Sequence, residues 1–93
     1  MAIKTVGKTK VNFELHAPEA KDVLLAGSFT EWGQTPVRLK RQKNGTWKTT
    51  IPLDRGTYEY RFLVDGQWQD DPQCHEHVSN PFGDRNCICT VLQ

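Results

Sequence analysis

Apolar and polar residues alternate with a period of two along most of the chain. Residues 11–16 alternate Val, Phe and Leu with Asn, Glu and His, which is the pattern of a strand with one face buried and the other in water. Residues 23–26 are all apolar and are followed by a glycine, as expected for a central strand that is buried on both faces. Residues 36–40 predict a short third strand.

Two tight turns organise the middle of the chain. Asn44-Gly45 predicts a hairpin, because both residues tolerate the positive φ of a type I′ turn. The strand after it places four side chains on one face: Trp47, Thr49, Ile51 and Leu53. Residues 57–64 form the clearest strand, and its aromatic row, Tyr58, Tyr60 and Phe62, is predicted to be core. A second turn, Asp65-Gly66, returns the chain.

The last quarter of the chain combines a long polar segment with one more strand. Residues 70–85 are rich in Asp, Pro, Asn and Gly, and the segment is too long for a hairpin loop, so it is a candidate functional loop. Residues 86–92 close the domain. About seven short strands separated by regular turns predict an all-β fold, an immunoglobulin-like antiparallel β-sandwich. Repeats and linkers are absent from the sequence, so residues 1–93 are expected to form a single domain.

The length, net charge and apolar content of the chain exclude several classes of function. The 93 residues exceed what a small core needs, but they are too few for a (β/α) barrel hydrolase of roughly 200 to 250 residues. A formal charge of +1 gives no field that would attract nucleic acid or an anionic membrane. Neither a membrane-spanning run nor, within residues 1–10, the apolar centre of a secretory signal is present. We therefore expect a cytoplasmic monomer that binds neither nucleic acid nor membrane.

The cysteines raise a separate question. Three cysteines are an odd number, which argues against a disulfide framework and agrees with a reducing compartment. Five ligands of the kind zinc prefers nevertheless gather near the C-terminus: Cys74, His75, His77, Cys87 and Cys89. Their spacing fits no common zinc motif, and buried thiols with solvated histidines explain the same residues. No cofactor is expected, and a metal site stays open as an alternative.

Three stretches together resemble a known family. They are Phe13–Ala20 leading into Val23-Leu-Leu-Ala-Gly-Ser-Phe-Thr-Glu-Trp32, then Tyr60-Arg-Phe-Leu-Val-Asp-Gly-Gln-Trp68 with Asp71-Pro72, and finally Asn80-Pro-Phe-Gly-Asp-Arg-Asn86. In this order they resemble the family 48 carbohydrate-binding modules. These include the glycogen-binding domain of the AMP-activated protein kinase β subunit and the early-set domains of isoamylases and branching enzymes. The resemblance covers about residues 13–91. It implies an early-set sandwich that binds α-glucan, with a catalytic protein as a further possible partner.

The resemblance also implies which residues contact sugar. Trp32 and Trp68 take the positions of the stacking aromatics, and Asn86 takes that of a polar contact. Arg61 stands where the kinase domain has a lysine, and Phe82 stands where it has a leucine that projects into the curled glucan. Both departures keep the required kind of contact.

The residues themselves support this chemistry. A glucose ring offers an apolar C–H face and a rim of hydroxyls, so its binding in water needs aromatic surface and fixed polar groups. Trp32 and Trp68 have polar neighbours that would bury them little, and strand parity points Arg61 away from the aromatic row. The alternatives are an indole folded onto the core, a solvated Arg61, an Asn86 that caps a turn and a Phe82 that packs its loop.

Two other functions remain to be weighed. Catalysis is not expected, because the adjacent Asp70 and Asp71 point to opposite sides of an extended chain and cannot flank one glycosidic bond. The same fold could instead serve as a protein-interaction or docking module, with its tryptophans filling a partner's pocket.

Overall fold

Two antiparallel sheets make up the architecture of the computed structural model, which describes residues 8–30, 32–81 and 83–92. The strands are β1 (Thr9–His16), β2 (Val23–Gly27), β3 (Val37–Arg38), β4 (Lys40–Arg41), β5 (Thr46–Leu53), β6 (Gly56–Val64), β7 (Gln67–Gln69), β8 (His77–Ser79) and β9 (Arg85–Val91). The helical structure among the described residues is one 3₁₀ turn, η1 (Trp32–Gln34). No helix in these ranges is long and apolar enough to span a bilayer.

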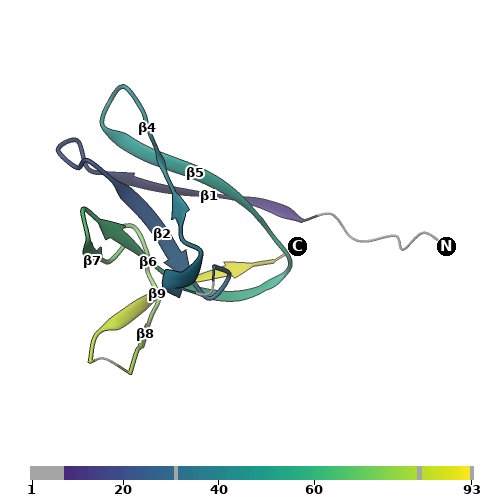
Figure 1. The fold of residues 1–93 in the computed structure, drawn as a ribbon. Helices are drawn as coiled ribbons and strands as arrows, with labels where there is room; N and C mark the ends of the chain where they lie inside the picture. The colour runs from purple at the N-terminus through teal and green to yellow at the C-terminus, as the bar shows by residue number, and fades with distance from the viewer. Residues whose placement is uncertain (1–7, 31, 82, 93) are drawn as a thin grey trace.

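The two sheets differ in their number of strands. The smaller has the order β1-β5-β4, and the larger has the order β3-β2-β6-β9-β8, with β7 pairing to β6. Figure 1 shows the long β1–β5 ribbon on one side and β2, β6 and β9 on the other. The predicted all-β antiparallel sandwich is confirmed.

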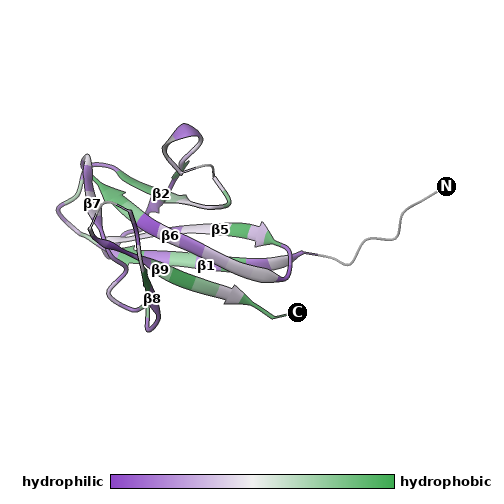
Figure 2. Ribbon diagram, turned by 90° about the horizontal axis from the view of Figure 1, so that it is seen from below, coloured by the Kyte–Doolittle hydropathy of each residue, from purple (hydrophilic) through white to green (hydrophobic). Residues whose placement is uncertain are grey.

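The core lies between the sheets and draws on both. Phe13 and Leu15 face inward from β1, and Tyr60 and Phe62 face inward from β6. Phe13 and Tyr60 meet edge to face, with ring centres 5.1 Å apart, a favoured aromatic geometry. The period-two pattern therefore identified the inner faces of β1 and β6 correctly. In Figure 2 hydrophilic and hydrophobic positions follow one another along β1, whereas β2 is coloured as mostly hydrophobic. Trp47 is buried, and its indole N–H donates to the carbonyl oxygen of Ala17 at 3.0 Å.

The predicted third strand is two strands. β3 pairs with β2 in the larger sheet, whereas β4 pairs with β5 in the smaller one. Leu39 lies between them, is only 2% exposed, and donates its backbone N–H to Val23 at 2.9 Å. A buried leucine thus anchors the chain in the core at the point where it crosses from one sheet to the other.

The predicted long loop also contains a strand. β8 lies within residues 70–85 and pairs with β9, so that His77 is opposite Cys87 and Ser79 is opposite Arg85. Its three residues are all exposed. A short edge strand without a buried face leaves no alternation in the sequence, which is why the polar composition hid it.

Candidate functional site

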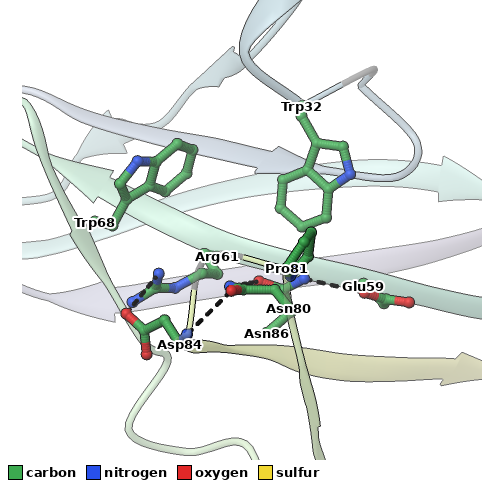
Figure 3. Close-up of a pocket in the computed structure, with 8 residues that line it drawn as sticks. All are labelled: Trp32, Glu59, Arg61, Trp68, Asn80, Pro81, Asp84 and Asn86. Carbon is green, nitrogen blue, oxygen red and sulfur yellow. Dashed lines mark hydrogen bonds and ion pairs between the residues drawn. The ribbon is translucent and has the colours of Figure 1, made fainter.

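A cavity of about 490 Å³ opens on the outer face of the larger sheet. β6 supplies its base, because Glu59 and Arg61 are two residues apart and point away from the buried Tyr60. The lining residues are Trp32, Glu59, Arg61, Trp68, Asn80, Pro81, Asp84 and Asn86. We call this cavity the groove. In Figure 3 its two indoles lie on the same side of a row of polar groups.

Trp32 reaches the groove from a tightly held turn. Its φ is +56°, a conformation that a bulky residue rarely adopts and that surrounding contacts must hold. The buried hydroxyl of Thr30 accepts from the backbone N–H of Gly27 at 2.9 Å and lies 3.1 Å from the carbonyl oxygen of Trp32. The backbone N–H of Thr35 donates to the carbonyl oxygen of Thr30 at 3.2 Å. Thr30 therefore fixes the loop that presents the indole.

Trp68 reaches the groove from the opposite hairpin. β7 follows the Asp65-Gly66 turn and pairs with β6, so that Trp68 is opposite Leu63. Asp65 braces this turn by accepting from the backbone N–H of Asp22 at 2.8 Å. Trp68 itself is 47% exposed, which leaves an aromatic face open to water.

Arg61 lies beneath the indoles at the centre of an ion-pair network. The residue is only 8% exposed. Its Nη2 lies 3.1 Å from Asp70 Oδ1, and its Nη1 lies 3.1 Å from Asp84 Oδ2. Asp70 also accepts from Arg85 Nε at 2.9 Å, and this hydrogen bond raises the pKa of Arg85 above its usual value. Two carboxylates from separate loops thus hold one guanidinium in place.

Asn86 is the polar group at the other end of the row. It is 6% exposed, donates to Glu59 Oε1 at 3.0 Å and accepts from Asn80 Nδ2 at 3.1 Å. A side-chain amide has two N–H donors and an oxygen with two lone pairs, so further hydrogen-bonding capacity remains. Asn86 is held by neighbouring side chains and does not serve as a turn cap.

Comparison with known sequences decides the family. The family described as "Glycogen recognition site of AMP-activated protein kinase" matches residues 9–93. The chain belongs to this family. The match confirms the resemblance drawn from the three sequence stretches, and we use the name glycogen-recognition family below.

Similar proteins come from plants and animals. The chain is 36% identical over 90 residues to Protein FLOURY ENDOSPERM 6, chloroplastic, of Oryza sativa subsp. japonica, an alignment that covers 97% of this chain and 16% of the relative. It is 44% identical over 71 residues to the 5'-AMP-activated protein kinase subunit beta-1 of Sus scrofa, covering 76% of this chain and 55% of the relative. It is 45% identical over 53 residues to Protein PTST homolog 2, chloroplastic, of Arabidopsis thaliana, an alignment that covers 57% of this chain and 10% of the relative. The chain therefore spans only part of the length of these relatives.

The groove of this glycogen-recognition family member brings together four of the five predicted site residues, Trp32, Arg61, Trp68 and Asn86. Phe82 lies outside the described residues. One expectation about exposure is corrected: Trp32 is half-buried, because its indole lines the groove wall. For Arg61 the structure rules out the alternative of a solvated side chain, because the residue is buried and two carboxylates enclose it.

Sequence reasoning missed several lining residues, among them Glu59, Asn80 and Asp84. Glu59 could have been found, since it shares strand parity with Arg61. Asn80 and Asp84 come from residues 70–85, which the sequence predicted as a candidate functional loop without naming its contact residues. Its pairing through β8 was needed to place them.

Proposed function

We propose that the groove binds α-1,4-linked glucans such as glycogen, starch and maltooligosaccharides. Trp32 and Trp68 stack on the C–H faces of glucose units, while Arg61 and Asn86 hydrogen-bond to hydroxyls. One observation carries the proposal: two indoles, from the η1 turn and from strand β7, line one cavity over a fixed row of polar groups. Phe82, which follows Pro81 in the sequence, is proposed as a further apolar contact on the basis of the resemblance.

Membership of the glycogen-recognition family supports a ligand of this class. Each stacked ring contributes about 1 to 2 kcal/mol, an energy typical of aromatic contacts. Two such rings, together with hydrogen bonds that remain exposed to water, give a dissociation constant in the micromolar to millimolar range. Such weak binding suits a module that keeps a larger protein on a polymer, where repeated sites raise the effective affinity. A catalytic protein partner is part of this proposal.

The proposed role is binding without catalysis. Asp70 pairs with arginines on the groove side, whereas Asp71 accepts from the hydroxyl of Tyr60, whose ring is in the core. The two carboxylates in the groove, Glu59 and Asp84, are each paired as well, with Asn86 and Arg61. A glycosidase needs one carboxyl group as an acid and another as a base or nucleophile beside the same bond. Incubation with maltoheptaose followed by a reducing-sugar assay should show no hydrolysis.

Titration with maltoheptaose tests the binding. We expect saturable heat in calorimetry and a saturable change in tryptophan fluorescence. Trp32→Ala and Trp68→Ala should each weaken binding about 5- to 30-fold, which corresponds to 1 to 2 kcal/mol. Lys43→Ala, an exposed change in the turn between β4 and β5, should leave it unaltered.

A parent protein that binds neither maltoheptaose nor β-cyclodextrin would sink the proposal and favour a docking module. Equal affinity in the parent and both tryptophan variants would place the sugar elsewhere.

The cellular location is a separate part of the proposal: the sequence favours the cytosol, whereas the names of two relatives state the chloroplast. Fluorescent tagging of the full-length protein distinguishes these. Sedimentation analysis tests the proposed monomeric state.

A further inference from the structure

Three metal-ligating side chains meet on the face of β9 opposite the groove. Cys87 follows Asn86 on the strand, so the two side chains point to opposite faces. Asn86 lines the groove, whereas Cys87 is fully buried in the core. His77 is the register partner of Cys87 on β8, and Cys74 joins them from the preceding turn. We call Cys74, His77 and Cys87 the thiol–imidazole cluster.

The spacing of this cluster fits one small ion. Cys74 Sγ lies 3.0 Å from His77 Nε2, and one ligand atom from each of the three residues lies within 4.8 Å of both others. Zinc binds thiolate sulfur at about 2.3 Å and imidazole nitrogen at about 2.0 to 2.1 Å in a tetrahedron, which separates its ligand atoms by about 3.5 to 3.8 Å.

We propose that Cys74, His77 and Cys87 bind one zinc(II) ion. Both thiols release their protons to solvent as they coordinate, and the imidazole binds as the neutral base. The described residues supply no fourth thiol, imidazole or carboxylate to the cluster, so water or a small external ligand takes the remaining position. The donors are soft to borderline, which selects zinc over magnesium or calcium.

The backbone holds the ligands before any ion binds. Antiparallel register partners carry their side chains on the same face of the sheet, which places His77 beside Cys87. The turn of Cys74 is fixed by its own N–H, which donates to the carbonyl oxygen of Asp71 at 3.1 Å. Asp71 is in turn held by the hydroxyl of Tyr60 at 2.7 Å. A site on paired strands and a braced turn loses little entropy when it closes on an ion.

The chain contains its own matched controls. His75 and Cys89 offer the same ligand types close by in sequence, yet neither belongs to the cluster. The thiols of Cys74, Cys87 and Cys89 are all free, so a reduced protein presents every candidate ligand. Cys74→Ser and His77→Ala test the site from its half-buried turn and its short edge strand. Cys87 is unsuited to mutation, because its side chain is part of the core.

The test uses the full chain, purified with a non-thiol reductant in metal-free buffer. Zinc is titrated against a chromophoric chelator, and cobalt(II) then reports thiolate coordination through sulfur-to-metal charge-transfer absorption. We expect one equivalent of zinc, a higher Tm with zinc, and the cobalt band. Cys74→Ser and His77→Ala should weaken binding by more than the roughly 10- to 100-fold that follows loss of an outer partner of a metal ligand. His75→Ala and Cys89→Ser should bind as the parent does.

Two results would overturn the inference. One is a folded, reduced parent protein, with Cys74 and Cys87 both titrating as free thiols, that retains no zinc after dialysis. The other is an equal loss of zinc in the His75→Ala or Cys89→Ser controls. The maltoheptaose titration is independent of both, since the cluster and the groove lie on opposite faces of β9.

Discussion

The guanidinium carbon of Arg61 lies 5.9 Å from the centre of the Trp68 ring. This is within the range of a cation–π contact, which is worth more when the cation is shielded from water, and Arg61 is buried. Asp70 and Asp84 hold the guanidinium from two loops. The arginine therefore both supports the exposed indole and ties together the segments that form the groove.

Replacement of Arg61 should separate charge from geometry. Arg61→Lys keeps the charge, but a single ammonium lacks the planar fork that reaches two carboxylates. We expect a loss of about 1 kcal/mol in the free energy of unfolding and weaker maltoheptaose binding.

Arg61→Met leaves Asp70 and Asp84 without their cation. It should lower the free energy of unfolding by about 2 to 3 kcal/mol. This is less than the cost of breaking a fully buried ion pair, because Asp84 is largely exposed. Urea unfolding and calorimetry measure both effects. Equal stability of Arg61→Met and the parent would show that the network contributes nothing.

Thr30 should control sugar binding without touching sugar. Thr30→Val removes the hydroxyl that accepts from Gly27 and lies beside the Trp32 carbonyl oxygen. A buried donor left without a partner costs about 1 to 3 kcal/mol, and the freed loop should present Trp32 less often. We expect lower stability and a several-fold weaker affinity for maltoheptaose.

The matched control is Thr50→Val, which removes an exposed hydroxyl that bonds Asn12 at 2.7 Å on the other sheet. Thr50→Val should change neither the free energy of unfolding nor the free energy of maltoheptaose binding by more than about 0.5 kcal/mol. If Thr30→Val binds maltoheptaose as well as the parent does, the loop around Trp32 is fixed by other contacts.

The sequence predicted most of the fold because both sheets have one buried face. Alternation in residues 11–16 and 57–64 identified the inner side chains, and Asp65-Gly66 marked a turn that the structure contains. It did not predict β8 or the crossing at Leu39, because a two- or three-residue strand has no periodicity to read. These elements exist through pairing with distant partners.

The groove was predictable in its aromatic residues and less so in its polar ones. Trp32 and Trp68 stand out as large apolar side chains among polar neighbours. The burial of Arg61 depends on carboxylates 9 and 23 positions further along the chain, at Asp70 and Asp84. Such long-range pairing is set by the tertiary fold and leaves no local pattern.

Gly27 should tolerate no side chain. A Cβ there would overlap the backbone carbonyl oxygen of Glu59 and lie 2.8 Å from the Phe29 ring. Glu59 is held in β6 by its pairing with Ile88, and the Phe29 ring packs against Phe13 and Tyr58. Gly27→Ala should cost at least about 2 to 3 kcal/mol by overpacking, measured by thermal or urea unfolding. Its control is Gly66→Ala, where a Cβ meets nothing within 4 Å and only the φ of +85° is unfavourable. A cost of about 1 to 2 kcal/mol is expected there, and equal losses in both variants would contradict the close approach of β2 and β6.

Tyr60 should make stability depend on alkaline pH. Burial, followed by its hydrogen bond to Asp71, raises the pKa of the Tyr60 hydroxyl far above its ordinary value. In the unfolded chain the same hydroxyl ionises near pH 10. Its contribution to stability is therefore fully present below about pH 10 and is lost progressively as the pH rises above that value, because only the unfolded state releases the proton.

Comparison with Tyr60→Phe isolates this effect. The variant removes the titrating group and leaves one oxygen of Asp71 without its 2.7 Å donor, so at pH 7 it should be less stable by about 1 to 2 kcal/mol. Between pH 9 and 11 the free energy of unfolding of the parent should fall more steeply than that of the variant, and the two curves should converge. Parallel curves would mean that Tyr60 ionises equally in both states and that its hydroxyl is open to solvent in the folded protein.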